Sequence, residues 1–429
     1  MIDLVAEKSE RRYRALPIGI AESAELAAEV AEQLEELVEL LHNLDLPVLT
    51  PEIVKVRCRQ VKYLMGSGKA SEIARLAQEC EADLLVFDCA LTPSQQRNWE
   101  RLSGCRVIGR EEVILNIFAE RAQTKEAVLQ VELARAKYYL PRLTGVWGHL
   151  SRQRGGSATN RGEGEAQIET DRRLLRSRIR QLETELAQVR NQRSTQRKSR
   201  LRRPVCTGAI VGYTNVGKSS LLNALSGSAV LAKDQLFATL DPVSRKIDLP
   251  GHQELVLTDT VGFIRNLPHN LVEAFKSTLE ETVLSDFLLL VLDVSSPRID
   301  EQWSTTCAVL KELGADEHRI QVVFNKCDRL DQERDAVLLA RLHGLFPNAV
   351  YVSAATGEGI GELLMRLADL SSALRRVYAV LLPPERHDLA AFIRAKGELY
   401  DEDYTPDGRI KMVFALEEKF IHKYTDYLQ

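Results

Sequence analysis

The sequence GYTNVGKSS, Gly212 to Ser220, indicates the kind of domain on which this chain is built. The apolar run before it, Ala209–Val211, predicts a strand, and the sequence SLLNAL that overlaps its end predicts a helix. Gly212 and Gly217 are separated by four residues and followed by Lys-Ser, which is the spacing of a phosphate-binding loop. A strand, such a loop and a helix in this order predict a nucleotide-binding α/β domain.

Each residue type in this loop has a chemical role. The glycines let backbone N–H groups surround the phosphates, and the N-terminal end of the following helix adds positive charge. Lys218 is expected to reach the outer phosphates and the Ser219 hydroxyl to hold Mg²⁺. Asn215 is a candidate ligand for a monovalent cation such as K⁺, with a turn-forming asparagine as the alternative. The predicted nucleotide-binding residues of the loop are Gly212, Tyr213, Thr214, Asn215, Val216, Gly217, Lys218 and Ser219.

Three further motifs follow in the order found in GTPases. Asp259-Thr260-Val261-Gly262 ends an apolar run, which places an acid near Mg²⁺ and the Gly262 N–H near the γ-phosphate. Asn325-Lys326-Cys327-Asp328 ends another, and its aspartate can accept both N–H groups on the guanine edge, which discriminates against adenine by roughly 10⁴-fold. Ser353-Ala354-Ala355 is expected to close over the base. These motifs predict an enzyme that hydrolyses GTP to GDP and phosphate.

The segment Leu236–Pro242, LFATLDP, lies between the phosphate loop and Asp259, where a GTPase carries its first switch. Thr239 is the candidate that closes on Mg²⁺ and the γ-phosphate, which makes it a second predicted metal ligand beside Ser219. The neighbours predicted to line the nucleotide with it are Phe237, Ala238, Leu240 and Asp241.

Phe263 stands directly after Gly262, at the position where a GTPase often carries a glutamine that orients the attacking water. A phenyl ring cannot orient water, so the predicted catalytic groups are limited to Lys218, Thr239 and Gly262. We therefore expect slow hydrolysis by the chain alone and faster hydrolysis with a partner that orders the site.

The composition is that of a folded intracellular protein. The 429 residues are 45% hydrophobic, which predicts two to four domains with sizeable cores. The seven cysteines are scattered without CxxC pairing, which indicates a reducing compartment and small buried side chains. No apolar run approaches a membrane span, and the first residues lack the apolar core of a signal peptide. We expect a cytoplasmic protein.

Residues 1–121 alternate strand-like and helix-like runs, which predicts an N-terminal α/β domain. Strands are expected at 15–20, 53–56, 84–87 and 106–108, and helices at 22–44, at 71–80, from 92 onward and through 118. The sequence Gly66-Ser67-Gly68-Lys69 lacks the spacing of a phosphate loop, and we interpret it as a turn before a helix and not as a second nucleotide site.

Residues 122–203 predict an antiparallel helical hairpin, because two apolar stripes recur there at helical spacing. Pro141 should end or kink the first helix. The joining segment, 145–164, contains six glycines together with Arg152, Arg154 and Arg161. The tract 172–203 carries twelve basic against two acidic residues, a balance of +10 in a chain of net charge −4. This asymmetry favours an RNA partner over a solvated helix face, with the three arginines as candidate contacts.

The GTPase (G) domain is expected over residues 204–374 and a small α+β domain over 375–429. The latter predicts a strand, a helix, two strands around Asp407-Gly408 and a final helix. The predicted fold class is α/β: a P-loop GTPase domain with an N-terminal α/β domain, a helical-hairpin arm and a small α+β C-terminal domain.

Together these features resemble the HflX family of bacterial translational GTPases over nearly the whole chain. The segments that carry the resemblance are LVFDCALTPSQQRNWERL, LQVELA, QIETDRRLLRSRI, GYTNVGKSS, DQLFATLDP and DTVGFIRNLPHNLVEAFKSTLEET. The resemblance implies binding to the large ribosomal subunit and its rRNA, ribosome-stimulated GTP hydrolysis, and splitting or rescue of stalled ribosomes under stress. We expect a monomer off the ribosome. Some members are described as binding ATP through the N-terminal region, a role that no residue here can be assigned.

The hairpin loop departs from the family pattern, which usually has Gly-Gly-Ile-Gly followed by Arg-Gly-Pro-Gly-Glu-Thr. Here the two parts are Gly155-Gly156-Ser157-Ala158 and Arg161-Gly162-Glu163-Gly164-Glu165-Ala166. Glu163 replaces proline and places a negative charge where rRNA contact is expected.

Two other functions stay open at this point. An rRNA- or tRNA-directed assembly or modification GTPase would need a further RNA-binding or catalytic module, and residues 375–429 show no such motif. A GTP-gated protein-binding switch would use the hairpin as a coiled coil with its partner. Salt separates these hypotheses, because RNA binding weakens steeply with ionic strength and an apolar contact does not.

Overall fold

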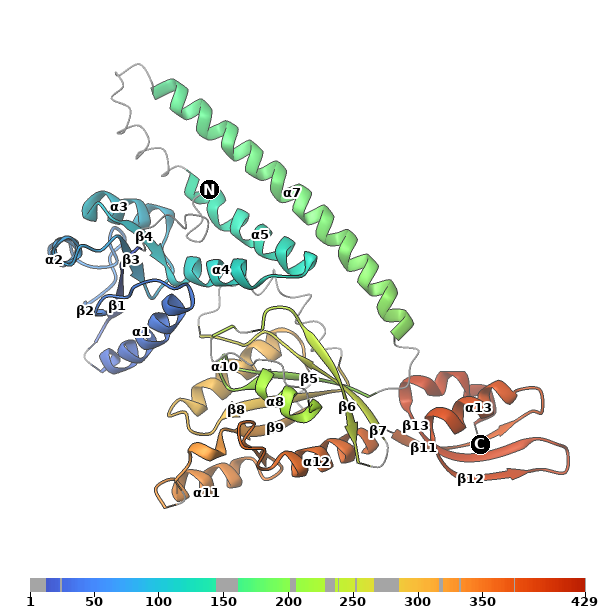
Figure 1. The fold of residues 1–429 in the computed structure, drawn as a ribbon. Coiled ribbons are helices and arrows are strands. Elements are labelled where there is room, and N and C mark those ends of the chain that lie inside the picture. Colours follow the sequence, from blue (N-terminus) through green and yellow to red (C-terminus); the bar gives the residue numbers. More distant parts are fainter. Residues whose placement is uncertain are drawn as a thin grey trace. The chain divides into compact units, whose positions relative to one another are not determined.

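A computed structural model describes most of the chain. The described residues are 13–23, 25–143, 161–200, 206–227, 236–237, 239–250, 253–265, 285–315, 319–331, 333–373 and 375–428. By their contacts they fall into two compact units, whose elements are labelled in Figure 1. Unit 1 comprises Met1–Asn191, Lys233–Asp241 and Val261–Thr278, and unit 2 comprises Gln192–Ala232, Pro242–Thr260 and Leu279–Gln429. The finer division into four domains stays a prediction.

Unit 1 begins with a four-stranded parallel sheet of order β2-β1-β3-β4. Strands β1 and β3 are buried along their whole length, as expected for parallel strands covered on both faces. The alternation of strands and helices confirms the predicted α/β class. The elements are β1 (Ala15–Ala21), α1 (Leu26–Asn43), β2 (Glu52–Lys55), α2 (Ser67–Glu79), β3 (Leu84–Phe87), α3 (Pro93–Ser103), β4 (Arg106–Gly109) and α4 (Arg110–Arg121).

The stretch Gly66–Lys69 belongs to the start of helix α2. Gly66 is the residue before the helix, and Ser67 to Lys69 form its first turn. The Lys69 ammonium group donates to the backbone carbonyl of Lys55. This confirms that the stretch leads into a helix.

The arm is formed by α5 (Lys125–Tyr139) and the long helix α7 (Arg161–Arg200). A small apolar core joins them, and it consists of Leu129, Leu133, Leu182 and Leu186 with Ile179 and Val189 packed against it. Helix α5 ends one residue before a 3-10 turn, Leu140–Arg142, that contains Pro141, as the sequence predicted. Arg152 and Arg154 lie outside the described residues, and Arg161 is the first residue of α7.

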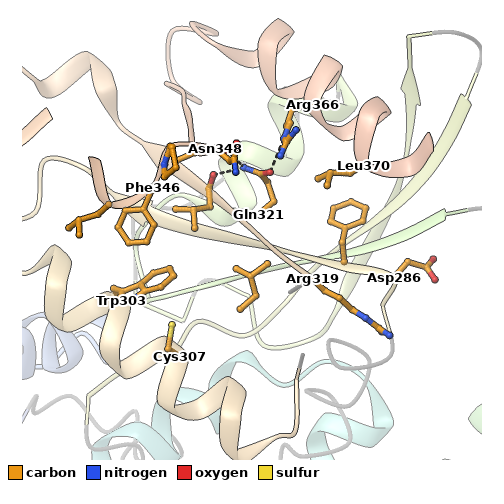
Figure 2. Close-up of a pocket in the computed structure, with 15 residues that line it drawn as sticks. Asp286, Trp303, Cys307, Arg319, Gln321, Phe346, Asn348, Arg366 and Leu370 are labelled. Carbon is orange, nitrogen blue, oxygen red and sulfur yellow. Dashed lines mark hydrogen bonds between the residues drawn. The ribbon is translucent and has the colours of Figure 1, made fainter. Parts of the chain in front are cut away.

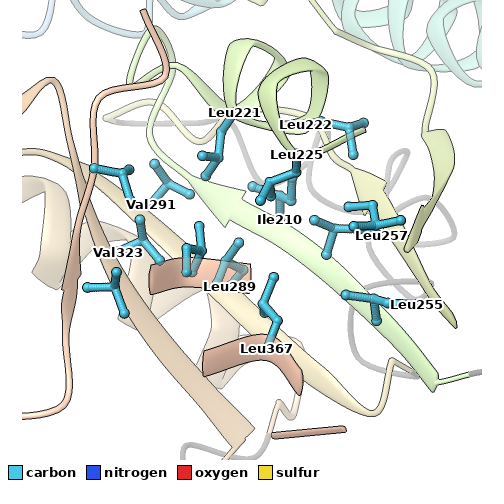
Figure 3. Packing of buried hydrophobic residues seen from close by; sticks show 14 of the residues in the cluster. Ile210, Leu221, Leu222, Leu225, Leu255, Leu257, Leu289, Val291, Val323 and Leu367 are labelled. Carbon is cyan, nitrogen blue, oxygen red and sulfur yellow. The ribbon is translucent and has the colours of Figure 1, made fainter. Parts of the chain in front are cut away.

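The G domain in unit 2 is a six-stranded sheet of order β10-β9-β8-β5-β7-β6, in which only the β6–β7 pair is antiparallel. Leu221 and Leu225 from α8 and Leu367 from α12 pack on sheet residues such as Ile210 and Leu289 to form its core (Figure 3). The elements are β5 (Cys206–Gly212), α8 (Lys218–Ser226), β6 (Val243–Leu249), β7 (Gln253–Asp259), β8 (Phe287–Asp293), α10 (Ile299–Glu312), β9 (Ile320–Asn325), α11 (Ala336–Leu345), β10 (Val350–Tyr351) and α12 (Ile360–Ala373). Ligands bind such sheets at the carboxyl ends of the parallel strands.

The C-terminal residues form an antiparallel sheet of order β11-β13-β12 with one helix, α13. Their bounds are β11 (Arg375–Leu382), α13 (His387–Lys396), β12 (Glu398–Tyr404) and β13 (Ile410–Glu417). The predicted final helix is present as two short 3-10 helices, Glu418–Lys423 and Thr425–Tyr427. Buried Phe420 and Tyr424 hold this short segment, so side-chain packing outweighs helix propensity there. None of the helices in the described part of the chain has the length and apolar character to span a bilayer.

Gly19 provides a test of the N-terminal packing, because side chains of helix α1 approach strand β1 closely at this residue. A Cβ atom at Gly19 would lie 2.5 Å from Val30 Cγ1 and 2.9 Å from Leu34 Cδ1. Gly19→Val should destabilise this sheet by about 1–3 kcal/mol through overpacking. Hydrogen exchange of the β1 amides measures the change. Gly68→Ala in α2, where a Cβ meets nothing within 4 Å, is the matched control. Unchanged exchange in Gly19→Val would contradict the close packing.

Candidate nucleotide-binding site

The phosphate loop connects the carboxyl end of β5 to helix α8, which begins at Lys218. Gly217 precedes the helix with φ +91°, and a Cβ atom on it would lie 2.3 Å from Asn325 Nδ2. Glycine is therefore required at this position by the backbone conformation and by the neighbouring side chain. The loop leads directly into a helix N-terminus, where backbone N–H groups attract anions.

The Lys218 side chain is buried against the backbone of the loop. Its ammonium group donates to the backbone carbonyl oxygens of Tyr213, at 2.7 Å, and Gly212, at 3.2 Å. Burial lowers the pKa of Lys218 to about 8, although the nearby Asp259 carboxylate acts in the opposite direction. A phosphate in the loop would supply the negative charge that favours the protonated lysine.

Ser219 and Asp259 bring two oxygen ligands together. The Ser219 hydroxyl donates to Asp259 Oδ2 at 2.6 Å, and the next residue, Thr260, donates its hydroxyl to the Ile210 carbonyl at 2.6 Å. Hydroxyl and carboxylate oxygens are the ligands that Mg²⁺ prefers. Within the described ranges no cluster of three or more His, Cys, Asp or Glu side chains could cage a metal. The donor set thus fits Mg²⁺ held by few protein oxygens together with phosphates and water.

The Asn325 side chain joins three of the motifs. Its amide nitrogen donates to the Val216 carbonyl at 2.8 Å, and its oxygen accepts from the Ala354 N–H at 3.0 Å. The next residue, Lys326, donates to the Asn215 carbonyl at 2.7 Å and pairs with Asp293 at 2.7 Å. The phosphate loop, the Asn-Lys-Cys-Asp motif and the Ser-Ala-Ala motif are therefore fixed to one another.

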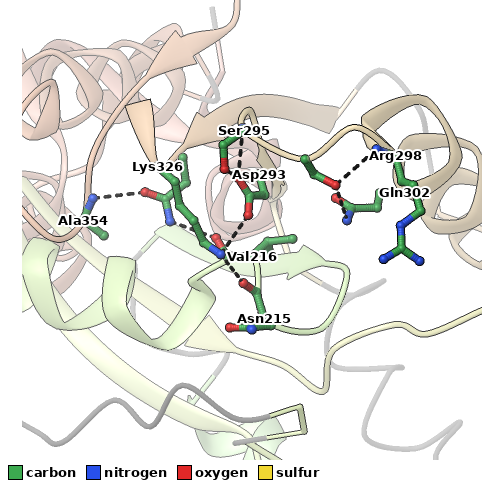
Figure 4. A network of polar contacts seen from close by, with 10 residues as sticks. Asn215, Val216, Asp293, Ser295, Arg298, Gln302, Lys326 and Ala354 are labelled. Atoms are coloured by element: carbon green, nitrogen blue, oxygen red, sulfur yellow. Dashed lines mark hydrogen bonds and ion pairs between the residues drawn. The ribbon is translucent and has the colours of Figure 1, made fainter. Parts of the chain in front are cut away.

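Asp293 was missed by the sequence analysis. It ends the apolar strand β8, as Asp259 ends β7, and this repeated pattern was the available signal. Its Oδ1 atom accepts from both the N–H, at 3.0 Å, and the hydroxyl, at 2.6 Å, of Ser295, which orients the carboxylate toward Lys326 (Figure 4).

Asp328 is exposed, as a residue that recognises a base should be. The hydroxyl of buried Ser353 donates to its Oδ1 atom at 2.6 Å and accepts from the Thr356 N–H at 3.2 Å. The Ser-Ala-Ala motif thus orients the carboxylate. Burial raises the pKa of the neighbouring Cys327 thiol to about 11, so this thiol stays protonated near neutral pH.

Asn215 has the left-handed conformation, with φ +60°, and its side chain is exposed. Asparagine tolerates this conformation better than most residues, so the geometry is that of the turn-forming alternative. The assignment of Asn215 to a K⁺ site stays a prediction.

Residues 236–241 of the predicted first switch belong to unit 1, whereas the phosphate loop, Asp259, Asp328 and Ser353 belong to unit 2. Leu236, Phe237 and Leu240 are buried, and Ala238 lies outside the described residues. The predicted nucleotide contacts of Phe237, Ala238, Thr239, Leu240, Asp241, Val261 and Gly262 stay predictions. Phe263 is 2% exposed, so its ring is packed inside the protein.

A pocket of about 720 Å³ lies elsewhere in the G domain, around the amino ends of β8 and β9 (Figure 2). Its polar groups bond one another, since Arg366 donates to Gln321 Oε1 at 3.0 Å and Gln321 donates to the Asn348 carbonyl at 2.7 Å. No sequence motif predicted this pocket. It lies at the amino ends of the strands, whereas the phosphate loop lies at their carboxyl ends.

Three protein-family models match the chain. "GTP-binding GTPase N-terminal" matches residues 31–119 and "GTP-binding GTPase Middle Region" matches residues 121–200. "50S ribosome-binding GTPase" matches residues 207–326, which include the phosphate loop and Asn325.

Similar proteins cover most of the chain. "GTPase HflX" of Akkermansia muciniphila is 48% identical over 432 residues, which cover 99% of this chain and 99% of that protein. "GTPase HflX" of Escherichia coli is 42% identical over 381 residues, 89% of each chain. Among solved structures, a GTP-binding protein of Sulfolobus solfataricus in complex with GDP is 26% identical, covers 84% of this chain and 99% of that chain, and has a TM-score of 0.44.

Asp328→Asn tests how the base is recognised. The substitution exchanges an acceptor for a donor, so the affinity for GDP should fall by roughly 10²- to 10⁴-fold and the affinity for xanthosine diphosphate should rise. Competition binding with both nucleotides measures the exchange. Asp300→Asn on α10, an exposed aspartate paired with Arg341, is the matched control. Unchanged GDP affinity in Asp328→Asn would contradict the assignment of Asp328 to the guanine edge.

Proposed function

Because this chain belongs to the HflX family of GTPases and hydrolyses GTP, we propose that it acts on the large ribosomal subunit and splits or rescues stalled ribosomes under stress. The observation that carries the ribosomal part is the match of residues 207–326 to 50S ribosome-binding GTPases. The basic arm helix α7 adds support, since rRNA is a polyanion. In this proposal the protein is a cytoplasmic monomer when it is off the ribosome.

We assign the nucleotide to the phosphate loop and its neighbouring motifs. Lys218 and the loop N–H groups hold the phosphates, and Asp328, oriented by Ser353, binds the guanine edge. Ser219 and Thr239 hold Mg²⁺, with Asp259 beside Ser219. When bound, Mg²⁺ neutralises charge on the phosphates. This assignment is supported by the contacts through Asn325, which fix the phosphate and base motifs in one geometry.

Hydrolysis by the chain alone should be slow, because the ring of Phe263 is buried and offers no polar group to water. The remaining groups near the γ-phosphate are Lys218, the Gly262 N–H and Thr239. We propose that the ribosome activates hydrolysis by holding the switch segment around Thr239 in its closed position on the nucleotide. Stabilisation of such a segment by a partner is a recurring way to activate GTPases.

Arm helix α7 is the proposed rRNA-binding element. Arg173 and Arg180 are exposed in its described part, whereas Arg176 forms an ion pair with Glu169 at 3.6 Å and Arg178 forms one with Glu132 of α5 at 2.7 Å. Pairing with α5 thus uses part of the positive charge and leaves other arginines facing solvent. Phosphate contacts made by such side chains release counterions, so binding should depend steeply on salt.

Purified large subunits test the proposed function directly. Intrinsic turnover should be on the order of 10⁻⁴ to 10⁻² per second, as for unassisted GTPases, and large subunits should accelerate it by ordering the switch. Phosphate release under multiple-turnover conditions measures the rate, and small subunits serve as the control. Equal rates with and without large subunits would contradict the proposal.

The arm is tested by co-sedimentation with large subunits, in the presence of a non-hydrolysable GTP analogue, across a salt series. Replacing Arg152, Arg154 and Arg161 by alanine should weaken binding and flatten its salt dependence. Glu163→Pro should strengthen binding, because it removes a carboxylate that rRNA phosphates repel. Nucleotide affinity should be constant in both variants. Equal binding of all three proteins at every salt concentration would show that Arg152, Arg154, Arg161 and Glu163 do not touch rRNA.

A further inference from the structure

Asp241, at the end of the predicted first switch, is bound to the start of arm helix α5 within unit 1. Its Oδ2 atom accepts from the backbone N–H groups of Gln123, at 3.0 Å, and Thr124, at 3.1 Å. The Thr124 hydroxyl donates to the other carboxylate oxygen, Oδ1. Thr124 is itself the N-cap of α5, since its hydroxyl oxygen accepts from the Ala127 N–H at 3.2 Å. A carboxylate at this position satisfies backbone donors and complements the positive end of the helix.

A second anchor lies at the other end of the same segment. The Phe237 ring packs edge-on against Phe118 of α4, with ring centroids 4.6 Å apart. Next to it, the Leu236 carbonyl accepts from the side-chain amide of Asn43, the last residue of α1, at 3.1 Å. Phe237 has φ +56°, which is uncommon for a bulky residue and persists only where the surroundings hold it. The N-terminal α/β elements therefore hold the first half of the segment, and α5 holds the second half.

Thr239 lies between these anchors, two residues from each. Since two residues of extended chain span roughly 7 Å, Thr239 stays within that distance of both Phe237 and Asp241. A closing movement of Thr239 therefore pulls on both contacts. The aromatic contact has no strict direction and tolerates a small displacement, whereas three hydrogen bonds to one carboxylate are directional and break when it moves.

We propose that Asp241 is a positioning residue that couples the nucleotide state to the arm. With GDP its carboxylate holds the start of α5. With GTP the closure of Thr239 on Mg²⁺ and the γ-phosphate withdraws the carboxylate and releases the N–H groups of Gln123 and Thr124 at the start of α5. This inference rests on the proposed role of Thr239. It adds a route by which GTP binding alters the first helix of the arm.

Hydrogen exchange of the full-length protein tests the coupling, with the amides of residues 123–127 observed in GDP and in a non-hydrolysable GTP analogue. In the wild type the analogue should speed exchange there by roughly fivefold, the ratio that corresponds to the loss of one helix cap. Asp241→Ala should exchange fast in both states. Asp241→Asn keeps an acceptor oxygen and should restore protection with GDP.

Two further variants separate coupling from a static cap. Thr239→Ala should keep slow exchange with the analogue, because the pull on Asp241 is lost. Asp248→Ala on β6, an exposed aspartate outside both anchors, should match the wild type.

Equal exchange in GDP and analogue in the wild type would overturn the proposal, and so would an analogue effect that survives Thr239→Ala. Stimulation by large subunits is measured on the same preparations. Its loss in the wild type counts against the ribosomal function, whereas normal stimulation without nucleotide-dependent exchange at α5 counts against the coupling alone.

Discussion

The hydrogen bonds of the Asn325 side chain are the contacts on which the candidate site depends. Its amide nitrogen bonds the Val216 carbonyl in the phosphate loop, and its oxygen bonds the Ala354 N–H in the base loop. Asn325 is buried, and removal of its side chain would leave two backbone groups unpaired at about 1–3 kcal/mol each. The same amide lies where a Cβ at position 217 would be, so it also requires Gly217. One side chain thus fixes the distance between the phosphate site and the base site.

An ion pair stabilises the same arrangement of motifs. The Lys326 ammonium group bonds the phosphate loop at Asn215 and the Asp293 carboxylate at the end of β8. Both side chains of the ion pair are mostly buried, so removal of one partner would leave an uncompensated charge, which is far more costly than loss of a surface pair. Residues from the ends of three neighbouring strands, β5, β8 and β9, are therefore linked before any nucleotide arrives. A preformed site of this kind loses little conformational entropy on binding.

The sequence predicted those parts of the molecule whose structure depends on residues close together in the chain. The phosphate loop, the strand-helix alternation of residues 15–121 and the leucine stripes of the arm each contain their own signal, and Pro141 ends α5 where expected. The final helix was predicted without its type, and it forms as two short 3-10 helices in which Phe420 and Tyr424 are buried. The hydrogen bonds between Asp241 and the residues just before α5 join positions more than one hundred residues apart, and no local sequence pattern predicts them. Asp293 had a local signal, but its meaning depends on the position of Lys326 in space.

The grouping of the switch residues with unit 1 follows from their composition. Leu236, Phe237 and Leu240 are apolar and need a core to bury them, and they are buried with Phe237 against Phe118 of α4. Arg265, shortly after Phe263, pairs with Glu29 of α1 in the same unit. The segments predicted to act as switches are thus held by side chains of α1 and α4, in the unit that also carries α5. A buried phenylalanine stands here where GTPases often carry a water-orienting glutamine, and the segment predicted as the first switch is linked through Asp241 to the start of arm helix α5.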